Sequence, residues 1–304
     1  MVYSVLFVTK VSSITMNRFI KNNPAFNLLR KFTPNFIMNI YKLNTSKSFF
    51  LHILDKMTCY LFYYINLKQK GSIKVVIFAQ GRTGSTLLEN LICSTGYFKK
   101  GGERFKQLGT HIKNPYKYIT GFSKNIFVKR VIFHLKFQHF TVDRVKKIDP
   151  ANFLQKLQND GWKIIYLRRE NKFNHALSNL IADHRGSCHK KDSNKESIKI
   201  KVDPEQLINM INKRLENDIY ETQVLSGLNY LPVIYEKDLE NSEFHQTTID
   251  KILDYLNLER RTVFTDLNKI NKFKLKDLIQ NYDEVINALE KNNFLRFLKN
   301  QPHE

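Results

Sequence analysis

Residues 73–96 constrain the fold more than any other stretch of this 304-residue chain. The stretch opens with an almost unbroken apolar run rich in β-branched residues, Ile73 to Ala79, which is typical of a strand buried on both faces of a parallel sheet. After a short polar segment, apolar residues recur on one face of a helix that Gly96 is placed to end. The stretch therefore predicts a buried strand, a tight loop and a helix in immediate succession.

The predicted loop is made of small or polar residues and one arginine: Gly81, Arg82, Thr83, Gly84, Ser85 and Thr86. Small side chains allow the backbone to close around a group the size of a phosphate. The start of the helix adds unpaired N–H groups and the positive end of its dipole. Because Arg82 contributes a charged donor as well, we predict that these six residues bind an anion.

The loop differs from the nucleoside-triphosphate motif G-x-x-x-x-G-K-[ST] at two positions. Counting from Gly84, the first glycine of that motif falls on Ala79 and its lysine falls on Ser85. A second buried strand, 162–167, ends in arginines and lacks the aspartate with which a Walker-type ATPase holds Mg²⁺. We therefore expect an anion other than a triphosphate.

Anion-binding residues also follow the strand 162–167. Arg168 and Arg169 stand at its end, and Asn171 can cap the next helix. Ser178 lies on a polar stripe of that helix, away from its apolar face. Two arginines and one hydroxyl placed in this way can converge on a single anion.

Strand and helix patterns alternate from residue 71 to residue 304. A third buried-strand pattern covers 231–235, a helix is predicted from about 204 to 227, and 275–298 reads as helical. We therefore predict an α/β fold with three layers, a mostly parallel sheet covered by helices on both faces. Residues 131–137 fit either a strand or a helix, and both alternatives remain open.

Three further polar residues are candidates for acid–base chemistry. Glu103 lies in a predicted loop, 98–105, which emerges beside the anion-binding turn, although an exposed glutamate is more often only solvated. His134 and His139 lie in an aromatic stretch, where histidines more often pack than react.

The composition limits the compartment and the partners. The formal net charge of +21 favours an anionic partner: nucleic acid, anionic lipid or a phosphorylated ligand. Three scattered cysteines predict neither a disulfide framework nor a metal site, so we expect a reducing compartment and no metal. The apolar stretch 57–67 is shorter than the roughly 20 residues that a membrane helix needs. We therefore expect a cytoplasmic protein.

Residues 1–70 form a basic, partly helical N-terminal extension with ten Lys and Arg residues and one acidic residue, Asp55. Segments of this kind can lie on an anionic membrane surface, as a peripheral contact. A helical cap on the main domain explains the same pattern equally well.

Together these motifs resemble those of the sulfotransferases that use 3′-phosphoadenosine-5′-phosphosulfate (PAPS), in particular the bacterial carbohydrate branch that includes trehalose and nodulation-factor sulfotransferases. Residues 76–88 resemble its 5′-phosphosulfate loop, and 165–178 resemble its 3′-phosphate motif. The pair Gly102-Glu103 lies where that branch carries Gly-Glu or Pro-Glu. Residues 235–239 and 281–285 are similar to two further segments of the family.

The resemblance implies a P-loop-like sulfotransferase fold for residues 71–304 and transfer of a sulfuryl group from PAPS to a hydroxyl of a carbohydrate or glycolipid. The loop 81–86, Arg168, Arg169 and Ser178 would hold the donor. Arg82 would stabilise charge on the leaving phosphate, and Glu103 would accept the hydroxyl proton, with His139 as the reserve base.

Two other functions fit parts of the sequence. A nucleic-acid-binding protein would use the high positive charge, but no RRM-like aromatic signature or helix-turn-helix pattern is present, so we expect no nucleic-acid partner. An atypical nucleotide kinase would have to turn over ATP despite Ala79 and Ser85.

Overall fold

The computed structural model describes residues 47–65, 72–105, 112–124, 129–140, 146–184, 199–267 and 275–298. These residues fall into two compact units. One contains the described parts of 1–68 and of 114–126, and the other contains the rest. The expectations for residues 1–46 lie outside the described residues.

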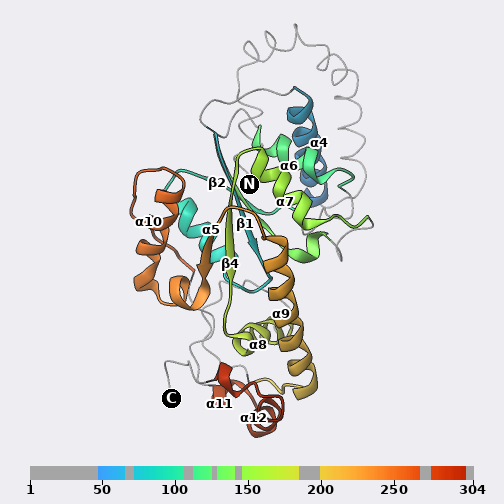
Figure 1. Ribbon diagram of the computed structural model, residues 1–304, viewed down its shortest axis with the longest axis vertical. Helices are drawn as coiled ribbons and strands as arrows, with labels where there is room; N and C mark the ends of the chain where they lie inside the picture. Colours follow the sequence, from blue (N-terminus) through green and yellow to red (C-terminus); the bar gives the residue numbers. More distant parts are fainter. Residues whose placement is uncertain are drawn as a thin grey trace. The chain divides into compact units, whose positions relative to one another are not determined.

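The larger unit is an α/β fold, with a central sheet and helices around it (Figure 1). The sheet has five strands, and every pair of neighbouring strands is parallel. The strand order is β2-β3-β1-β4-β5. The strands are β1 (Ile73–Ala79), β2 (Lys99–Glu103), β3 (Arg130–Leu135), β4 (Trp162–Arg168) and β5 (Tyr230–Ile234). The apolar run of β1 is buried because this strand lies at the centre of the sheet, as its sequence predicts.

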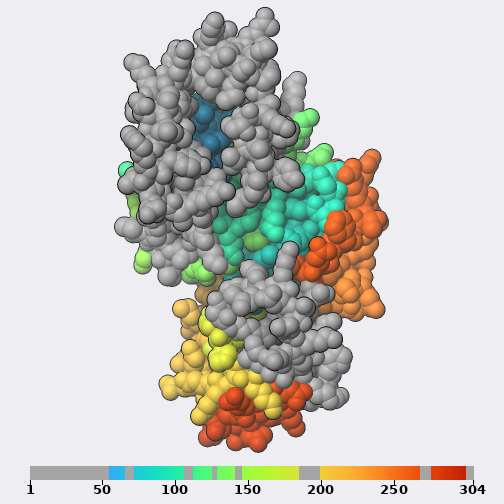
Figure 2. Space-filling model, turned by 180° about the vertical axis from the view of Figure 1, so that it is seen from behind, coloured from blue at the N-terminus to red at the C-terminus, as the bar shows by residue number. Residues whose placement is uncertain are grey.

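Helices cover both faces of this sheet, which confirms the three-layer prediction. On one face, α5 (Ser85–Ser94) and α10 (His245–Tyr255) share a core with alternate residues of β1, β4 and β5. The segment after α10 packs against the end of α5, since Arg261 donates a hydrogen bond to the carbonyl oxygen of Thr95 (3.0 Å). In Figure 2 the orange surface of this segment adjoins the teal surface of the region that contains α5. On the other face, α7 (Pro150–Asn159) and the end of α9 (Pro204–Val224) cover the aromatic side of the sheet.

A second apolar core joins the helices beyond the carboxyl ends of the strands. It lies among α8 (Lys172–His184), the first turns of α9, α11 (Leu275–Leu278) and α12 (Tyr282–Lys291). The prediction of one helical stretch over 275–298 is wrong in detail. Ile279 leaves the helix to form a parallel bridge with Ile200, so the helix starts again at Tyr282.

Two other predictions are resolved by pairing across the sheet. Residues 99–103 are not a loop but the edge strand β2, which bulges between Lys100 and Glu103 where two glycines lie. The ambiguous stretch 131–137 is mostly strand β3, and the 3-10 turn η2 (Phe137–Phe140) follows it.

In its described residues, the smaller unit contains α4 (Lys47–Ile65) and α6 (Pro115–Ser123). A helix from within residues 71–304 thus packs with the N-terminal extension. Gly121 allows the close approach, because a Cβ added there would lie 1.7 Å from the carbonyl oxygen of Cys59. The hydroxyl of Tyr118 donates to Asp55 Oδ2 across the same pair of helices (2.7 Å).

Candidate functional site

The candidate site lies at the carboxyl ends of the strands beside β1, because β3 flanks β1 on one side and β4 on the other. Open α/β sheets bind ligands where the strand order reverses in this way. The loop 80–84 leaves β1 at this edge. Glu103, Lys136, Arg168 and Tyr235 end or follow the other four strands.

The loop after β1 has a backbone conformation that few residues adopt. Arg82 has a φ of 69° and Gly84 a φ of 90°, both in the left-handed region. The hydroxyl of Thr83 donates to the carbonyl oxygen of Gln80 and closes the turn (2.8 Å). Arginine rarely occupies this region, and such backbone strain is concentrated at functional sites.

Helix α5 begins immediately after this loop without a capping side chain. Its N-cap is Gly84. By contrast, side-chain oxygens of Asn114, Asp149 and Asp203 cap α6, α7 and α9. The first N–H groups of α5 therefore face the loop without a side-chain cap, as at helix N-termini that receive an external anion.

The ring of Tyr235 leaves no room for a side chain at residue 84. A Cβ added to Gly84 would lie 2.7 and 2.9 Å from two ring carbons of Tyr235. We expect Gly84→Ala to lower the free energy of unfolding by roughly 2–4 kcal/mol through backbone strain and overpacking. Chemical denaturation measures it. Gly161→Ala is the matched control, because Gly161 has a φ of 81° but no atom within 4 Å of an added Cβ. Equal losses in the two variants would contradict the importance of the Tyr235 contact.

Arg82 extends from the loop to α8 and contacts Ser178. Its Nε and Nη2 atoms lie 3.3 and 3.2 Å from the Ser178 hydroxyl oxygen. The sequence places these two residues in separate anion-binding motifs. The structure brings them into direct contact, so the two motifs adjoin.

The two arginines after β4 have different surroundings. Arg169 is only 9% exposed, and its guanidinium lies 4.5 Å from the centre of the Tyr235 ring. It also donates to the carbonyl oxygen of Arg82 (3.5 Å) and lies 3.5 Å from a carboxylate oxygen of Glu236. The side chain of Arg168 is 43% exposed and pairs with Glu170 (3.0 Å). Arg169 therefore supports the loop, whereas Arg168 is accessible to a ligand.

Glu236, at the carboxyl end of β5, holds the start of α8. Its two carboxylate oxygens accept hydrogen bonds from the backbone N–H groups of Glu170 (2.9 Å) and Asn171 (3.0 Å). The side chain of Asn171 accepts from the N–H of Asn174 (2.9 Å), which confirms the predicted cap. The carboxylate of Glu236 therefore occupies these two N–H groups, and a ligand near α8 cannot use them.

Sequence reasoning missed Lys136, which follows β3 and is 8% exposed. Its Nζ atom lies 2.5 Å from a carboxylate oxygen of Glu103. A Cβ added to Gly81 would lie 3.8 Å from the same Nζ. A cation is thus present beside the loop although the loop contains no lysine. The sequence signal that could have identified Lys136 is a single charged residue directly after an apolar strand.

Glu103 is positioned by a buried carboxylate on α5. One oxygen of Glu89 accepts from the N–H groups of Gly101 (3.2 Å) and Gly102 (2.7 Å), and the other lies 3.1 Å from His134 Nε2. These contacts fix the bulge that carries Glu103. His134 therefore has a structural role, because it contacts the carboxylate that holds the bulge.

His139 is fully buried in the turn after β3. Its Nδ1 accepts from the backbone N–H of Lys136 (3.0 Å), and its ring packs edge-on against Phe105 with centres 6.1 Å apart. This arrangement orients the turn that carries Lys136. A direct role for His139 as the reserve base stays a prediction.

Gln80 connects the loop to a buried polar network. Its amide nitrogen donates to Asp218 (2.9 Å) and Glu221 (3.2 Å), and its amide oxygen accepts from Arg214 (3.2 Å). Lys172 on α8 lies 2.5 Å from the other carboxylate oxygen of Asp218. Helices α8 and α9 thereby fix the residue that precedes the loop.

His175 on α8 holds the loop directly. Its Nε2 atom lies 2.6 Å from the carbonyl oxygen of Gly81. Burial, together with the nearby charge of Arg214, keeps the pKa of His175 well below its usual value. The neutral ring therefore donates its Nε2–H to Gly81 at neutral pH.

The stability of the fold is expected to depend on the ionisation of Glu221. Burial raises the pKa of this carboxyl from 4.5 to about 7, although hydrogen bonds from Gln80 and Tyr166 oppose the shift. The folded state therefore holds the proton more tightly than the unfolded state does. The contribution of this carboxyl to the free energy of unfolding is fully present below about pH 4.5. It is lost as the pH rises to about 7. The loss is on the order of 3 kcal/mol.

Urea denaturation between pH 5 and 8 measures this effect. Glu221→Gln should match the original protein at pH 5 and be the more stable of the two at pH 8. Glu216→Gln, an exposed substitution on the same helix, is the control. If the pH dependence of Glu221→Gln equals that of Glu216→Gln, Glu221 is not the titrating group.

Two findings concern metal binding and membrane spanning in the described parts of the chain. In these parts, no group of three or more His, Cys, Asp or Glu residues is placed to hold a metal ion. Nor does any helix there have the length and apolar character to span a membrane.

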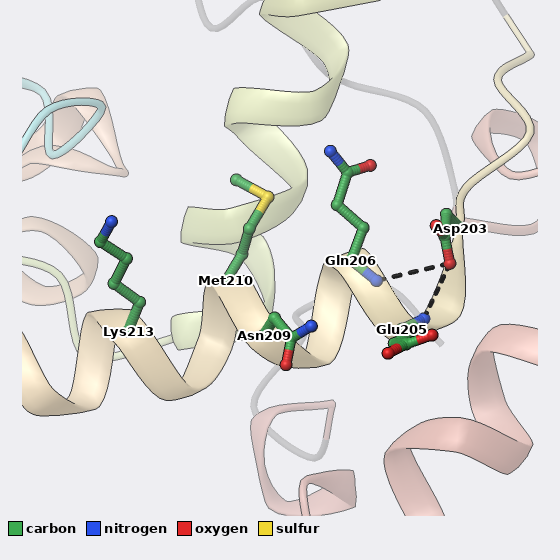
Figure 3. Close-up of a pocket in the computed structure, with 6 residues that line it drawn as sticks. All are labelled: Asp203, Glu205, Gln206, Asn209, Met210 and Lys213. Carbon is green, nitrogen blue, oxygen red and sulfur yellow. Dashed lines mark hydrogen bonds between the residues drawn. The ribbon is translucent and has the colours of Figure 1, made fainter.

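An open groove of about 340 Å³ runs along the first turns of α9 (Figure 3). It is lined by Asp203, Glu205, Gln206, Asn209, Met210 and Lys213. Asp203 uses its carboxylate to cap the helix, accepting from the N–H groups of Glu205 and Gln206 at 2.9 and 3.4 Å. The groove contains none of the loop residues, and its acidic lining does not favour an anionic ligand.

No protein-family model and no curated protein matches the chain. Several solved structures are similar to it. The sulfotransferase from Alicyclobacillus acidocaldarius is 11% identical, with a TM-score of 0.44 over 76% of this chain and 93% of the other. The sulfotransferase domain from the curacin biosynthetic pathway is 12% identical, with a TM-score of 0.37 over 69% and 83%.

A mouse sulfotransferase complexed with PAP is 14% identical, with a TM-score of 0.36 over 81% of this chain and 72% of the other. At such identities and TM-scores, similarity alone assigns no activity. The residues of the site therefore have to support any assignment.

Proposed function

We propose that this chain is a sulfotransferase that transfers a sulfuryl group from PAPS to a hydroxyl of a carbohydrate or glycolipid. The contact between Arg82 and Ser178 is the observation that carries the proposal. It joins the loop after β1 to the motif after β4. PAPS has a phosphosulfate at one end and a 3′-phosphate at the other, so it would supply one anion to each motif.

The residues of the site fit such a donor. The uncapped N–H groups at the start of α5 and the nearby Lys136 would bind the phosphosulfate end. Ser178 and the accessible Arg168 would bind the 3′-phosphate. The buried Arg169 would act by holding the loop in shape. When bound, PAPS supplies an activated sulfuryl group.

The chain itself would supply the charge and the base. Arg82 and the loop N–H groups would stabilise negative charge on the leaving phosphate oxygen. Glu103 would accept the proton of the acceptor hydroxyl, held in place by its ion pair with Lys136. The carbohydrate or glycolipid class of the acceptor follows from the resemblance of residues 76–88 and 165–178, and it remains part of the proposal.

Transfer of labelled sulfate tests this function. PAPS carrying ³⁵S would be incubated with the full chain and an extract of glycans and glycolipids. We expect label in the carbohydrate fraction, and we expect Ser178→Ala to raise the donor KM more than it lowers kcat. Absence of transfer to any hydroxyl-bearing fraction, or phosphate transfer from labelled ATP in its place, would overturn the proposal.

A further inference from the structure

We infer that Glu221 on α9 is a positioning residue for the anion-binding loop, on which it acts through Gln80. The inference rests on the proposed function of that loop. The inference goes beyond that function in two ways: Glu221 itself binds no substrate, and donor binding depends on pH.

The contacts form a direct route from Glu221 to the loop. One carboxylate oxygen of Glu221 accepts from the Gln80 amide (3.2 Å) and from the Tyr166 hydroxyl (3.0 Å). The carbonyl oxygen of Gln80 in turn accepts from Thr83, inside the loop. Since Arg214 and Asp218 bind the same amide, its orientation is fixed and the start of the loop is fixed with it.

Glu221 is fully buried, and its second carboxylate oxygen has no hydrogen-bond partner among the described residues. A proton on that oxygen would leave both observed hydrogen bonds intact. Loss of the proton places an additional negative charge behind the loop, where little water can screen it. The hydrogen bonds of Glu221 therefore allow both the protonated and the ionised carboxyl, and the two forms differ by one negative charge behind the loop.

The other charged groups of the network determine the consequence. Arg214 and Asp218 lie on the same helix, Lys172 and the neutral His175 lie on α8, and Tyr166 lies on β4. With Glu221 protonated, this set carries one net positive charge. With Glu221 ionised, it is neutral, so the loop attracts an anion less strongly as the pH rises through about 7.

Calorimetric binding of adenosine 3′,5′-bisphosphate at pH 6 and pH 8 tests the inference. The phosphates of the ligand titrate equally in every variant, so the comparison with Glu221→Gln isolates the protein. We expect the affinity of the original protein to fall roughly three- to tenfold more than that of Glu221→Gln. Glu216→Gln should behave like the original protein. Parallel profiles for Glu221→Gln and the original protein would overturn the inference.

Tyr166→Phe tests whether Glu221 is the titrating group, because a purely structural role of Glu221 would leave the pH at which affinity falls unchanged. It removes a hydrogen bond that favours the ionised carboxylate, so the fall in affinity should shift to higher pH. An unchanged midpoint would count against Glu221 as the titrating group.

Amide hydrogen exchange without ligand separates this inference from the proposed function. If the protein binds no bisphosphate at either pH, the proposed function fails. The inference is then decided by the protection of amides 81–86. The ratio of protection between the original protein and Glu221→Gln should change from pH 6 to pH 8, and a constant ratio would overturn it.

Discussion

Substituting Arg82 by alanine should lower kcat/KM for sulfuryl transfer by about 10²–10³-fold, the typical loss when one preorganised donor to a developing negative charge is removed. Arg82 would have this role because it belongs to the loop that would bind the phosphosulfate, and its contact with Ser178 orients the guanidinium. Steady-state transfer of labelled sulfate at several donor concentrations measures the loss.

Arg260→Ala is the control for this substitution. Arg260 is exposed and pairs with Asp254, outside the site. Its removal should leave kcat/KM within about twofold of the original value, since exposed ion pairs contribute little. If Arg82→Ala is as active as Arg260→Ala, Arg82 does not contact the reacting group.

Glu103→Gln should lower kcat by about 10²–10⁴-fold, the usual contribution of a general base. Glutamine cannot accept the proton of the acceptor hydroxyl. Its amide oxygen can still accept a hydrogen bond from Lys136, so the fold around β2 should persist. Single-turnover transfer of labelled sulfate at saturating donor measures the chemical step, and thermal denaturation confirms that the variant is folded.

Retained activity in Glu103→Gln would transfer the role of base to a histidine. His139→Gln would then be the next variant, because His139 contacts the backbone of Lys136. A fall in kcat for His139→Gln together with a changed pH profile would identify it. If only its stability falls, its role is packing against Phe105.

The strand β1, the loop after it and the cap of α8 could be predicted because their signals are local. An apolar run, glycines at 81 and 84, and an asparagine before a helix each dictate structure within a few residues. The edge strand β2 could not be predicted from its own sequence. Lys99-Lys100-Gly101-Gly102 has no apolar alternation, and Glu89 and β3 hold it in the sheet.

The candidate site likewise contains features that could be predicted and features that could not. That the loop and the α8 motif meet follows from topology, because the carboxyl ends of neighbouring parallel strands share one edge. The separate surroundings of Arg168 and Arg169 depend on Tyr235 and Glu236, more than sixty residues away along the chain. Lys136 depends in the same way on its contact with Glu103. Tertiary contacts of this kind leave no local pattern in the sequence.

The thermal shift of the full chain with adenosine 3′,5′-bisphosphate and with ATP, at equal concentrations, shows directly whether both motifs recognise one donor. We expect the bisphosphate to raise Tm far more than ATP does, because Ser178 and Arg168 would hold a 3′-phosphate that ATP lacks. Ser178→Ala should reduce this difference. Equal shifts with the two nucleotides in the original protein would contradict the claim that one donor occupies both motifs.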